Sequence, residues 1–218
     1  MITLHHVPAS RSFRILWLLE EMGLSCDLVE YAIGDGSLRV PEFLAKSPAG
    51  RVPALEIDGI TIFESGAIVQ YLCETREACG LGRKPGTPER VAFLEWLGFA
   101  ETQASIVGNL NLQHVFLRDP AMRSATVLKI EAARLAATMK VVERALEEQE
   151  FLLPSGFSAA DTMMGFNLFS LGYFVKMDAF PNLRAYRARI EGRETYQRAK
   201  ARDGEQRFYD RAFYAWDD

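Results

Sequence analysis

The stretch GRVPALEIDGITIFES, residues 50–65, carries the clearest structural signal in the chain. It holds two short apolar runs, 54–57 and 60–63, separated by Asp58-Gly59. Asp-Gly between two such runs is typical of a β-hairpin, because both central residues of a type I′ turn need a positive φ angle. Ser65 follows the second run and opens a helical pattern. The stretch therefore predicts an antiparallel hairpin followed by a helix.

The chain before this hairpin alternates between strand and helix patterns. Residues 2–6 form a short β-like run, and apolar side chains recur at helical spacing over 11–23. Residues 26–32 predict a second strand, and residues 41–45 a short helix with proline in its first turn. The predicted order is β-α-β-α-β-β-α. This order predicts an α/β domain with a mixed four-stranded sheet.

The strand patterns end at a segment rich in glycine and proline, residues 79–86, which predicts a linker. The net charge changes at the same place. Residues 1–80 hold 6 basic and 11 acidic residues, whereas the rest of the chain holds 19 and 18. Only helical patterns follow, so we expect an α/β domain over 1–78 and an all-α helical bundle domain over 87–218.

Composition limits the classes of function. The 218 residues are 49% hydrophobic, which allows one domain or two small ones. A net charge of −4 argues against nucleic acid as the main partner. The three cysteines, at 26, 73 and 79, form no CxxC pair, which argues against a disulfide framework and a structural zinc site. Without a leader or an apolar stretch of about 20 residues, we expect a soluble cytoplasmic protein with no membrane partner.

Four motifs along the chain resemble the glutathione S-transferase superfamily. They are PASRS (8–12), GRVPAL (50–55), FESGAI (63–68) and FSAAD (157–161), in this order around a linker. The start of the chain most resembles bacterial and fungal members with a Ser-Arg pair opening the first helix. The resemblance covers nearly the whole chain. It implies a thioredoxin-like N-terminal domain, an all-α C-terminal domain, and an enzyme with glutathione as its co-substrate and no metal.

The resemblance implies a glutathione-binding role for five residues. It implies a cis peptide bond at Val52-Pro53, where a small peptide docks as an extra strand. It places the γ-glutamyl carboxylate on Ser65, because a helix N-terminus favours an anion, and the α-amino group at Glu64. Arg51 either contacts the glycyl carboxylate or remains a solvated cation.

Ser10, Arg11 and Ser12 are the candidate catalytic residues. A hydroxyl donor at a helix N-terminus stabilises a thiolate, in addition to the helix dipole, and so raises the fraction of reactive thiol. Ser10 is alternatively a plain helix cap, Ser12 is the competing hydroxyl or the actual cap, and Arg11 either assists or is solvated. The mechanism needs no histidine base. His5 and His6 lie in the first predicted strand, where one must face inward, and are expected to be structural.

The long helix after the linker and the aromatic tail imply an apolar pocket for an electrophile. Its candidate residues are Val107, Asn111, His114 and Tyr209, for each of which ordinary packing is the alternative. The implied function is conjugation of the glutathione thiolate to a hydrophobic electrophile, a detoxification reaction. The alternatives are a glutathione-dependent disulfide reductase or peroxidase on the same site, and a non-catalytic glutathione-binding regulatory protein.

Two further expectations concern the C-terminal domain. Ser158 and Asp161 are spaced as a capping box, which predicts the start of a buried helix. Thr162 departs from the family, in which this position usually holds an apolar residue. The resemblance also implies a homodimer, in which either Glu101 or Gln103 reaches the glutathione of the neighbouring subunit.

Overall fold

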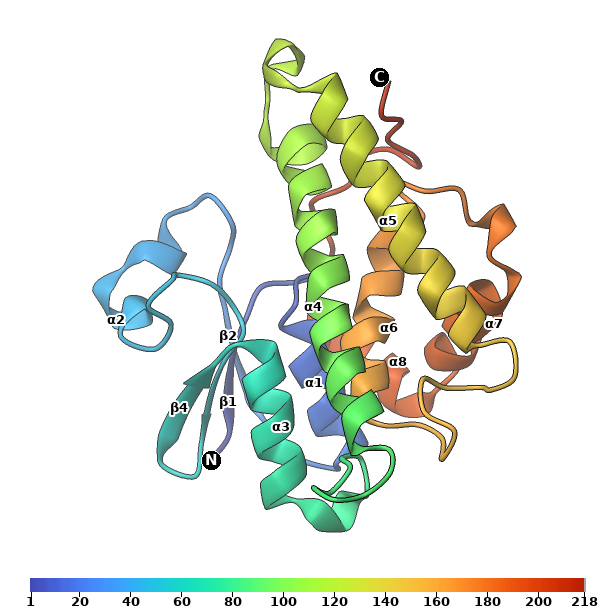
Figure 1. Cartoon of the computed structure of the whole chain (residues 1–218). Coiled ribbons are helices and arrows are strands. Elements are labelled where there is room, and N and C mark those ends of the chain that lie inside the picture. The colour runs from blue at the N-terminus through green and yellow to red at the C-terminus, as the bar shows by residue number, and fades with distance from the viewer. Residues whose placement is uncertain (218) are drawn as a thin grey trace. The chain divides into compact units, whose positions relative to one another are not determined.

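The computed structural model describes residues 1–217, which form two compact units (Figure 1). The first unit contains Met1–Thr87 together with Glu191–Arg207, and the second contains Pro88–Ile190 together with the tail from Phe208. The units differ from the predicted domains in two respects, because residues 191–207 join the N-terminal unit, and so do the predicted linker 79–86 and Thr87. The domain limits at 78 and 87 stay a prediction.

The first unit holds the mixed four-stranded sheet that the sequence predicts. Its strands are β1 (Thr3–His6), β2 (Asp27–Glu30), β3 (Ala54–Ile57) and β4 (Ile60–Phe63). They lie in the order β2-β1-β3-β4, with β1 parallel to β2 and the other neighbours antiparallel. The thioredoxin-like arrangement is thereby confirmed.

The hairpin between β3 and β4 has the predicted turn. Ile57 pairs with Ile60, so that Asp58 and Gly59 are the two turn residues. Their φ angles are 55° and 79°, which are the positive values that a type I′ turn requires. The Asp-Gly pair therefore determines where the sheet reverses.

Four α-helices belong to the first unit. They are α1 (Phe13–Glu21), α2 (Pro41–Leu44), α3 (Ser65–Thr75) and α8 (Glu194–Asp203). Figure 1 shows α1 and α3 on one side of the sheet and α2 on the other. His5 lies 5.8 Å from the ring of Phe43 in α2, whereas His6 bonds to Asp203 at the end of α8. Both faces of β1 are therefore covered, which buries both histidines.

Helix α8 packs on α1 through aromatic and charged contacts. The ring of Tyr196 meets Trp17 edge-on at 5.1 Å and Phe13 at 5.3 Å. The Arg193 guanidinium donates two hydrogen bonds, of 2.8 and 2.7 Å, to the Glu21 carboxylate. These contacts explain why a segment from the end of the chain belongs to the N-terminal unit.

The second unit is built of helices. They are α4 (Arg90–Asn111), α5 (Ala125–Ala145), α6 (Ala159–Leu171) and α7 (Pro181–Glu191), and α4 continues into a π-helical turn over Leu112–Phe116. Short 3-10 turns lie at Pro120–Met122 and Met177–Ala179 in this unit, and at Ser37–Arg39 and Glu77–Cys79 in the first unit. No helix among the described residues combines the length and apolar character needed to cross a bilayer.

The predicted capping box at the start of α6 is confirmed. The Ser158 hydroxyl accepts from the Ala160 N–H, and the Asp161 carboxylate accepts from the Ser158 N–H at 2.8 Å. The helix is buried on nearly all sides, as the sequence predicts. Thr162 is buried as well, and its hydroxyl donates to the Ala159 carbonyl at 2.9 Å, which satisfies the polar atom at this unusual position.

Candidate functional site

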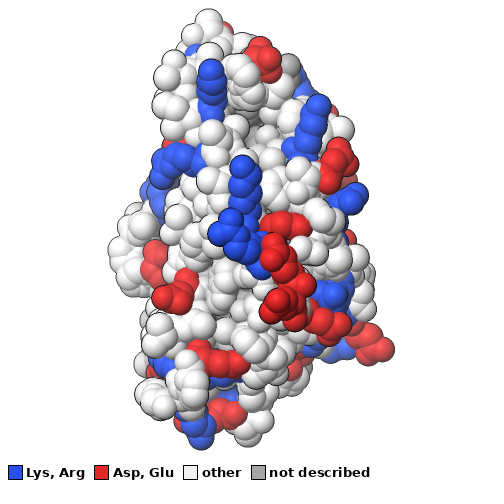
Figure 2. Space-filling model, turned by 45° about the vertical axis from the view of Figure 1, so that its right-hand side comes forward, with Lys and Arg blue, Asp and Glu red and all other residues white. Residues whose placement is uncertain are grey.

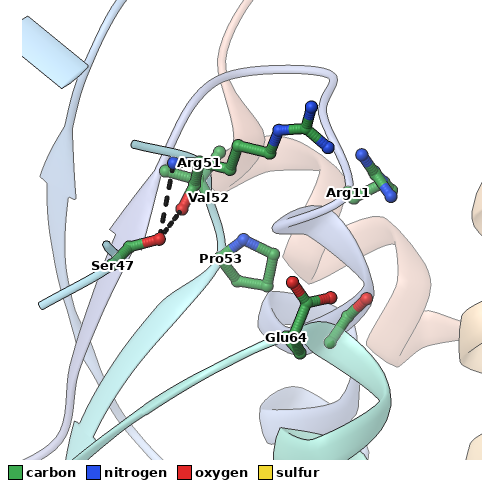
Figure 3. Close-up of a pocket in the computed structure, with 7 residues that line it drawn as sticks. Arg11, Ser47, Arg51, Val52, Pro53 and Glu64 are labelled. Atoms are coloured by element: carbon green, nitrogen blue, oxygen red, sulfur yellow. Dashed lines mark hydrogen bonds between the residues drawn. The ribbon is translucent and has the colours of Figure 1, made fainter. Parts of the chain in front are cut away.

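A pocket in the first unit brings together six of the twelve predicted site residues (Figure 3). The described residues that line it are Arg11, Ser47, Arg51, Val52, Pro53, Glu64 and Ser65. Six of the seven are candidates from the sequence, drawn from three motifs that are far apart in the chain. The fold therefore joins the Ser-Arg, Val-Pro and Glu-Ser motifs in one place.

Ser47 is the lining residue that the sequence analysis missed. Its hydroxyl donates to the Arg51 carbonyl at 2.7 Å, and it also accepts from the Arg51 N–H at 3.4 Å (Figure 3). The loop turns at Gly50, whose φ is +61° and where a Cβ would lie 2.6 Å from the Leu38 carbonyl. The sequence SPAG at 47–50 is a turn signal that could have indicated this loop.

The peptide bond between Val52 and Pro53 is cis, as the resemblance implies. Val52 comes before Ala54, the first residue of β3 in the sheet register. The backbone groups of Val52 thus lie outside the sheet ladder and beside the pocket. This placement suits the main chain of a small peptide, which can add hydrogen bonds at a sheet edge.

The N-terminus of α3 forms another wall of the pocket. Glu64 has φ 72° and ψ 117°, a strained conformation for a residue other than glycine, and such strain is frequent at functional sites. Ser65 is 3% exposed, and its hydroxyl accepts a 3.0 Å hydrogen bond from the fully buried Arg14 guanidinium. Arg14 therefore adds positive charge to a helix end that already favours anions.

The charges around the pocket are separated by sign. In Figure 3 the Arg11 and Arg51 guanidinium groups lie in the upper part of the view, and the Glu64 carboxylate lies below them, beside Pro53. Guanidinium groups and a helix N-terminus favour carboxylates, whereas Glu64 suits an ammonium group. The pocket is chemically matched to a small zwitterionic peptide.

Ser10 and Ser12 lie beside this pocket, at the start of α1. Ser10 is half-buried and next in sequence to Arg11, whereas Ser12 is 0% exposed. Ser12 occupies the cap position of α1, but its hydroxyl makes no bond to the helix N–H groups. It lies instead 2.9 Å from the Ser10 hydroxyl and 2.8 Å from His6 Nδ1. The buried Ser12 is thus placed to act on Ser10 rather than on a ligand.

His6 and Asp203 connect to these serines, which the sequence analysis did not foresee. His6 Nε2 lies 2.9 Å from the Asp203 carbonyl oxygen. The Asp203 carboxylate accepts from the N–H of Ala9 at 3.1 Å, where Ala9 has a φ of 54°. Asp203 is 197 positions from His6 along the chain, so no spacing pattern could have indicated the contact.

The predicted electrophile residues all lie in the second unit. The Tyr209 hydroxyl donates to the Asn111 side chain at 2.9 Å, and the Tyr209 ring stacks on Tyr173 at 3.9 Å. His114 is buried in the π-helical turn and packs against Phe174, at 5.9 Å. Phe174 in turn contacts Tyr209, so three of the four residues join one aromatic cluster. Burial raises the pKa of Tyr209, which keeps its hydroxyl protonated.

Val107, the fourth predicted residue, is buried on α4, one helical turn before Asn111. A second pocket in this unit was not predicted. It is lined by Phe169, Gly172, Tyr173, Arg187 and Ala212. Tyr173 belongs both to this pocket and to the aromatic cluster. Phe169 near the end of α6 and Tyr173 in the turn after it are an aromatic pair four positions apart, which is the signal that could have indicated this pocket.

Comparisons with known proteins indicate a family. Residues 1–74 match the family model described as the glutathione S-transferase N-terminal domain. Glutathione S-transferase 3 of Schizosaccharomyces pombe is 32% identical over 184 residues, covering 78% of this chain and 74% of that protein. Disulfide-bond oxidoreductase YfcG of Escherichia coli is 38% identical over 104 residues, covering 44% of this chain and 47% of that protein.

A solved structure agrees over a longer range. The glutathione transferase from Methylococcus capsulatus has a TM-score of 0.83 at 27% identity, covering 93% of this chain and 98% of that one. The shared motifs, the pocket that they form and the long alignment with the yeast protein lead to one conclusion. This chain belongs to the glutathione S-transferase family of enzymes.

Proposed function

We propose that this chain binds glutathione in the pocket of the first unit and conjugates its thiolate to a hydrophobic electrophile. The observation that carries the proposal is the meeting of Arg11, Arg51, the cis Val52-Pro53 peptide, Glu64 and Ser65 in one pocket. Glutathione is a small peptide with two carboxylates and one amine. The charged side chains of the pocket are of the signs that these groups require.

Each part of glutathione has a partner in this proposal. Ser65 and the α3 N-terminus bind the γ-glutamyl carboxylate, and Glu64 binds the neighbouring ammonium group. The backbone of Val52 pairs with the cysteinyl residue as an added strand. Arg51 is exposed at the rim, where it reaches the glycyl carboxylate.

The thiol lies at Ser10 in the same proposal. A free thiol has a pKa of about 8.5, so only a few per cent is thiolate at neutral pH. The Ser10 hydroxyl donates to the thiolate, and Arg11 together with the α1 N-terminus adds positive potential. Ser12 contributes through Ser10, because its own hydroxyl is buried.

The electrophile belongs to the aromatic part of the second unit. His114 and Tyr209 belong to an aromatic cluster, Asn111 is hydrogen-bonded to Tyr209, and the buried Val107 lies one turn before Asn111; an aromatic environment of this kind favours a hydrophobic small molecule. Holding the two reactants in a fixed geometry supplies part of the rate.

A conjugation assay tests this function. The purified protein is mixed with glutathione and several chromogenic aryl halides, and product is followed by absorbance. We expect glutathione-dependent turnover and retention of the protein on immobilised glutathione. Failure to conjugate any of the electrophiles, together with failure to bind immobilised glutathione, would exclude the proposal. Binding without turnover would favour a non-catalytic regulatory protein.

A disulfide reductase or peroxidase on the same site is the second candidate. It is favoured by the 38% identity to a relative named as a disulfide-bond oxidoreductase. This chemistry needs no protein cysteine if two glutathione molecules react in turn. Faster turnover of a small disulfide or hydroperoxide than of any aryl halide would favour it over conjugation.

A homodimer completes the proposal. Apolar side chains are exposed on α4, at Val91 and Leu94, and on α5, at Ile130 and Val141, and a partner subunit would cover them. Gln103 is fully buried, so Glu101 is the residue of the two that remains to reach a partner's glutathione. Light scattering should give twice the monomer mass, and a single species at monomer mass would contradict the dimer.

The cytoplasmic location stays a prediction.

A further inference from the structure

We propose that His6 is the acceptor of the glutathione thiol proton, which reaches it through the hydroxyl groups of Ser10 and Ser12. The inference rests on the proposed binding of glutathione with its thiol at Ser10. It assigns a chemical role to a histidine that the sequence analysis expects to be structural.

The three side chains form a continuous hydrogen-bonded chain into the protein. Ser10 Oγ lies 2.9 Å from Ser12 Oγ, and Ser12 Oγ lies 2.8 Å from His6 Nδ1. Ser10 is half-buried, whereas Ser12 and His6 are 0% and 1% exposed. This series of hydrogen bonds thus begins beside the pocket and ends at an imidazole shielded from solvent.

The contacts of His6 fix the direction of these hydrogen bonds. Its Nε2 faces the Asp203 carbonyl oxygen, which can only accept, so Nε2 carries a hydrogen. In neutral His6, Nδ1 is then an acceptor. The Ser12 hydroxyl lies 2.8 Å from Nδ1 and 3.3 Å from the Val7 carbonyl oxygen, and it donates along the shorter contact to Nδ1. Because Ser12 has a single hydroxyl hydrogen, Ser10 must donate to Ser12 in their shared bond. The hydrogen bonds from Ser10 through Ser12 to His6 are therefore oriented to move a proton inward.

Each of the two hydroxyl groups then gives up one proton and gains one, the thiol loses one, and His6 gains one. Ser10 Oγ takes the proton of the thiol as the S–H bond breaks, and the electron pair stays on sulfur. Ser10 passes its own hydrogen to Ser12 Oγ, and Ser12 passes its hydrogen to His6 Nδ1. Afterwards His6 donates to Ser12, Ser12 donates to Ser10, and Ser10 donates to the thiolate. The reversed chain stabilises the charge that the transfer creates, and it returns the proton to the exterior when the product leaves.

A buried carboxylate lies beside His6. The Asp203 carboxylate is 1% exposed and lies 3.5 Å from His6 Nε2. The Ala9 N–H and the Lys200 ammonium hold this carboxylate, at 3.1 and 2.7 Å. Of the charged groups on the neighbouring strand, Glu30 is paired in register with His6 and is exposed.

The adjacent histidine supplies a matched control. His5 is 2% exposed on the same strand, but its side chain faces the opposite side of the sheet. Its ring nitrogens lie 2.9 Å from the Tyr31 hydroxyl and 2.7 Å from the Glu56 carboxylate. A substitution at His5 disturbs a buried ring in β1 without touching the chain to Ser10.

The first test measures the pKa of the thiol of bound glutathione by the ultraviolet absorbance of the thiolate. His6→Asn keeps a hydrogen-bonding group near the position of Nδ1 but cannot take up a proton, and Ser12→Ala interrupts the chain. We expect each to raise this pKa by about one unit, a tenfold loss of thiolate. The double variant should show no further rise, and His5→Asn should leave the pKa as in the wild type.

The second test uses the wild type alone and does not depend on the folding of any variant. Titration calorimetry in buffers of different ionisation enthalpy counts the protons released when glutathione binds as thiolate. We expect release of well under one proton per thiolate, because His6 retains it. Release of a full proton, or a thiol pKa that is the same in His6→Asn, Ser12→Ala and wild type, would overturn this inference alone. Failure of the wild type to bind glutathione would overturn it together with the proposed function.

Discussion

Arg14 shows how a buried side chain prepares the proposed ligand site. Arginine is rarely fully buried, yet Arg14 is 0% exposed within α1. Its guanidinium donates to the Ser65 hydroxyl at 3.0 Å, and Ser65 lines the pocket. The contact fixes the serine that is proposed to bind a carboxylate, and it places a positive charge behind it.

Arg14→Lys should therefore weaken glutathione binding. Lysine keeps the charge but lacks the planar fork of donors, so the bond to Ser65 is lost or bent. A hydrogen bond from a charged group contributes about 1.5–3 kcal/mol, which corresponds to about a tenfold or larger rise in Kd. Calorimetric titration with glutathione measures this Kd. Arg184→Lys, at an exposed position of α7, is the control and should bind as the wild type does. Equal affinity for glutathione in all three proteins would show that Arg14 does not contribute to the site.

The residues that the sequence predicts and those that it misses differ in a physical way. Val52, Pro53, Glu64 and Ser65 lie in short motifs, where neighbours in the chain are neighbours in the pocket. Asp203 acts on His6 from the far end of the chain. A contact of this kind arises from packing between distant elements, so it becomes visible only in the structure.

At the scale of elements, the start of α6 was predictable in detail. The Ser158 to Asp161 spacing alone specifies the reciprocal bonds of a capping box, and the structure has them. The partners of Asp161 were not predictable, since its carboxylate also accepts from the Leu152 N–H and the Tyr186 hydroxyl. Local spacing determines the cap, and tertiary packing determines what else the cap residue holds.

Ser158→Ala should destabilise the second unit. The hydroxyl of Ser158 satisfies a helix N–H that has no other partner within the helix, and loss of such a cap costs about 1–2 kcal/mol. Urea unfolding followed by circular dichroism measures the change. Ser105→Ala removes a hydroxyl that only donates to the Glu101 carbonyl on the surface of α4, and it should cost less than about 0.5 kcal/mol. Equal losses in the two variants would contradict the role of the cap.

Helix α8 illustrates what an amphipathic pattern leaves open. The sequence predicts a helix at this place but groups it with the C-terminal domain, whereas Tyr196 and Arg193 attach it to α1. Periodicity shows that a helix has a buried face. It does not show which element covers that face.

At the scale of the whole molecule, the net charge of −4 gave no guide to an anionic ligand. Basic and acidic side chains are interspersed on the face that Figure 2 shows. The pocket gathers Arg11, Arg51 and the α3 N-terminus in a unit that is acidic overall. The local arrangement of charges, rather than their sum, sets the character of the site.

Acid should weaken the attachment of α8 to α1 through Glu20. Burial raises the pKa of Glu20, but hydrogen bonds from Arg202 and Arg198 outweigh that effect and lower the pKa below its ordinary value of 4.5. A lowered pKa means that the folded state favours the carboxylate. Its contribution to stability is complete above the unfolded pKa and is lost as the pH falls through the folded one.

Glu20→Gln should therefore lower the free energy of unfolding at neutral pH, by about 1 kcal/mol for a partly exposed ion pair. The difference from the wild type should disappear in acid, where both proteins lack the charge. Urea unfolding across the pH range checks this, with Glu95→Gln, at an exposed position of α4, as the control. A difference that is constant with pH would show that the carboxylate charge is not what stabilises the contact.

Titration of the protein with glutathione by calorimetry tests the central claim most directly. We predict one saturable site per chain in the wild type, and a rise in Kd of about tenfold or more, about 1.4 kcal/mol, in both Ser65→Ala and Glu64→Gln. Glu42→Gln, at an exposed position of α2 in the same unit, should bind as the wild type does. Absence of saturable binding by the wild type, or the same affinity in all four proteins, would contradict the assignment of this pocket to glutathione.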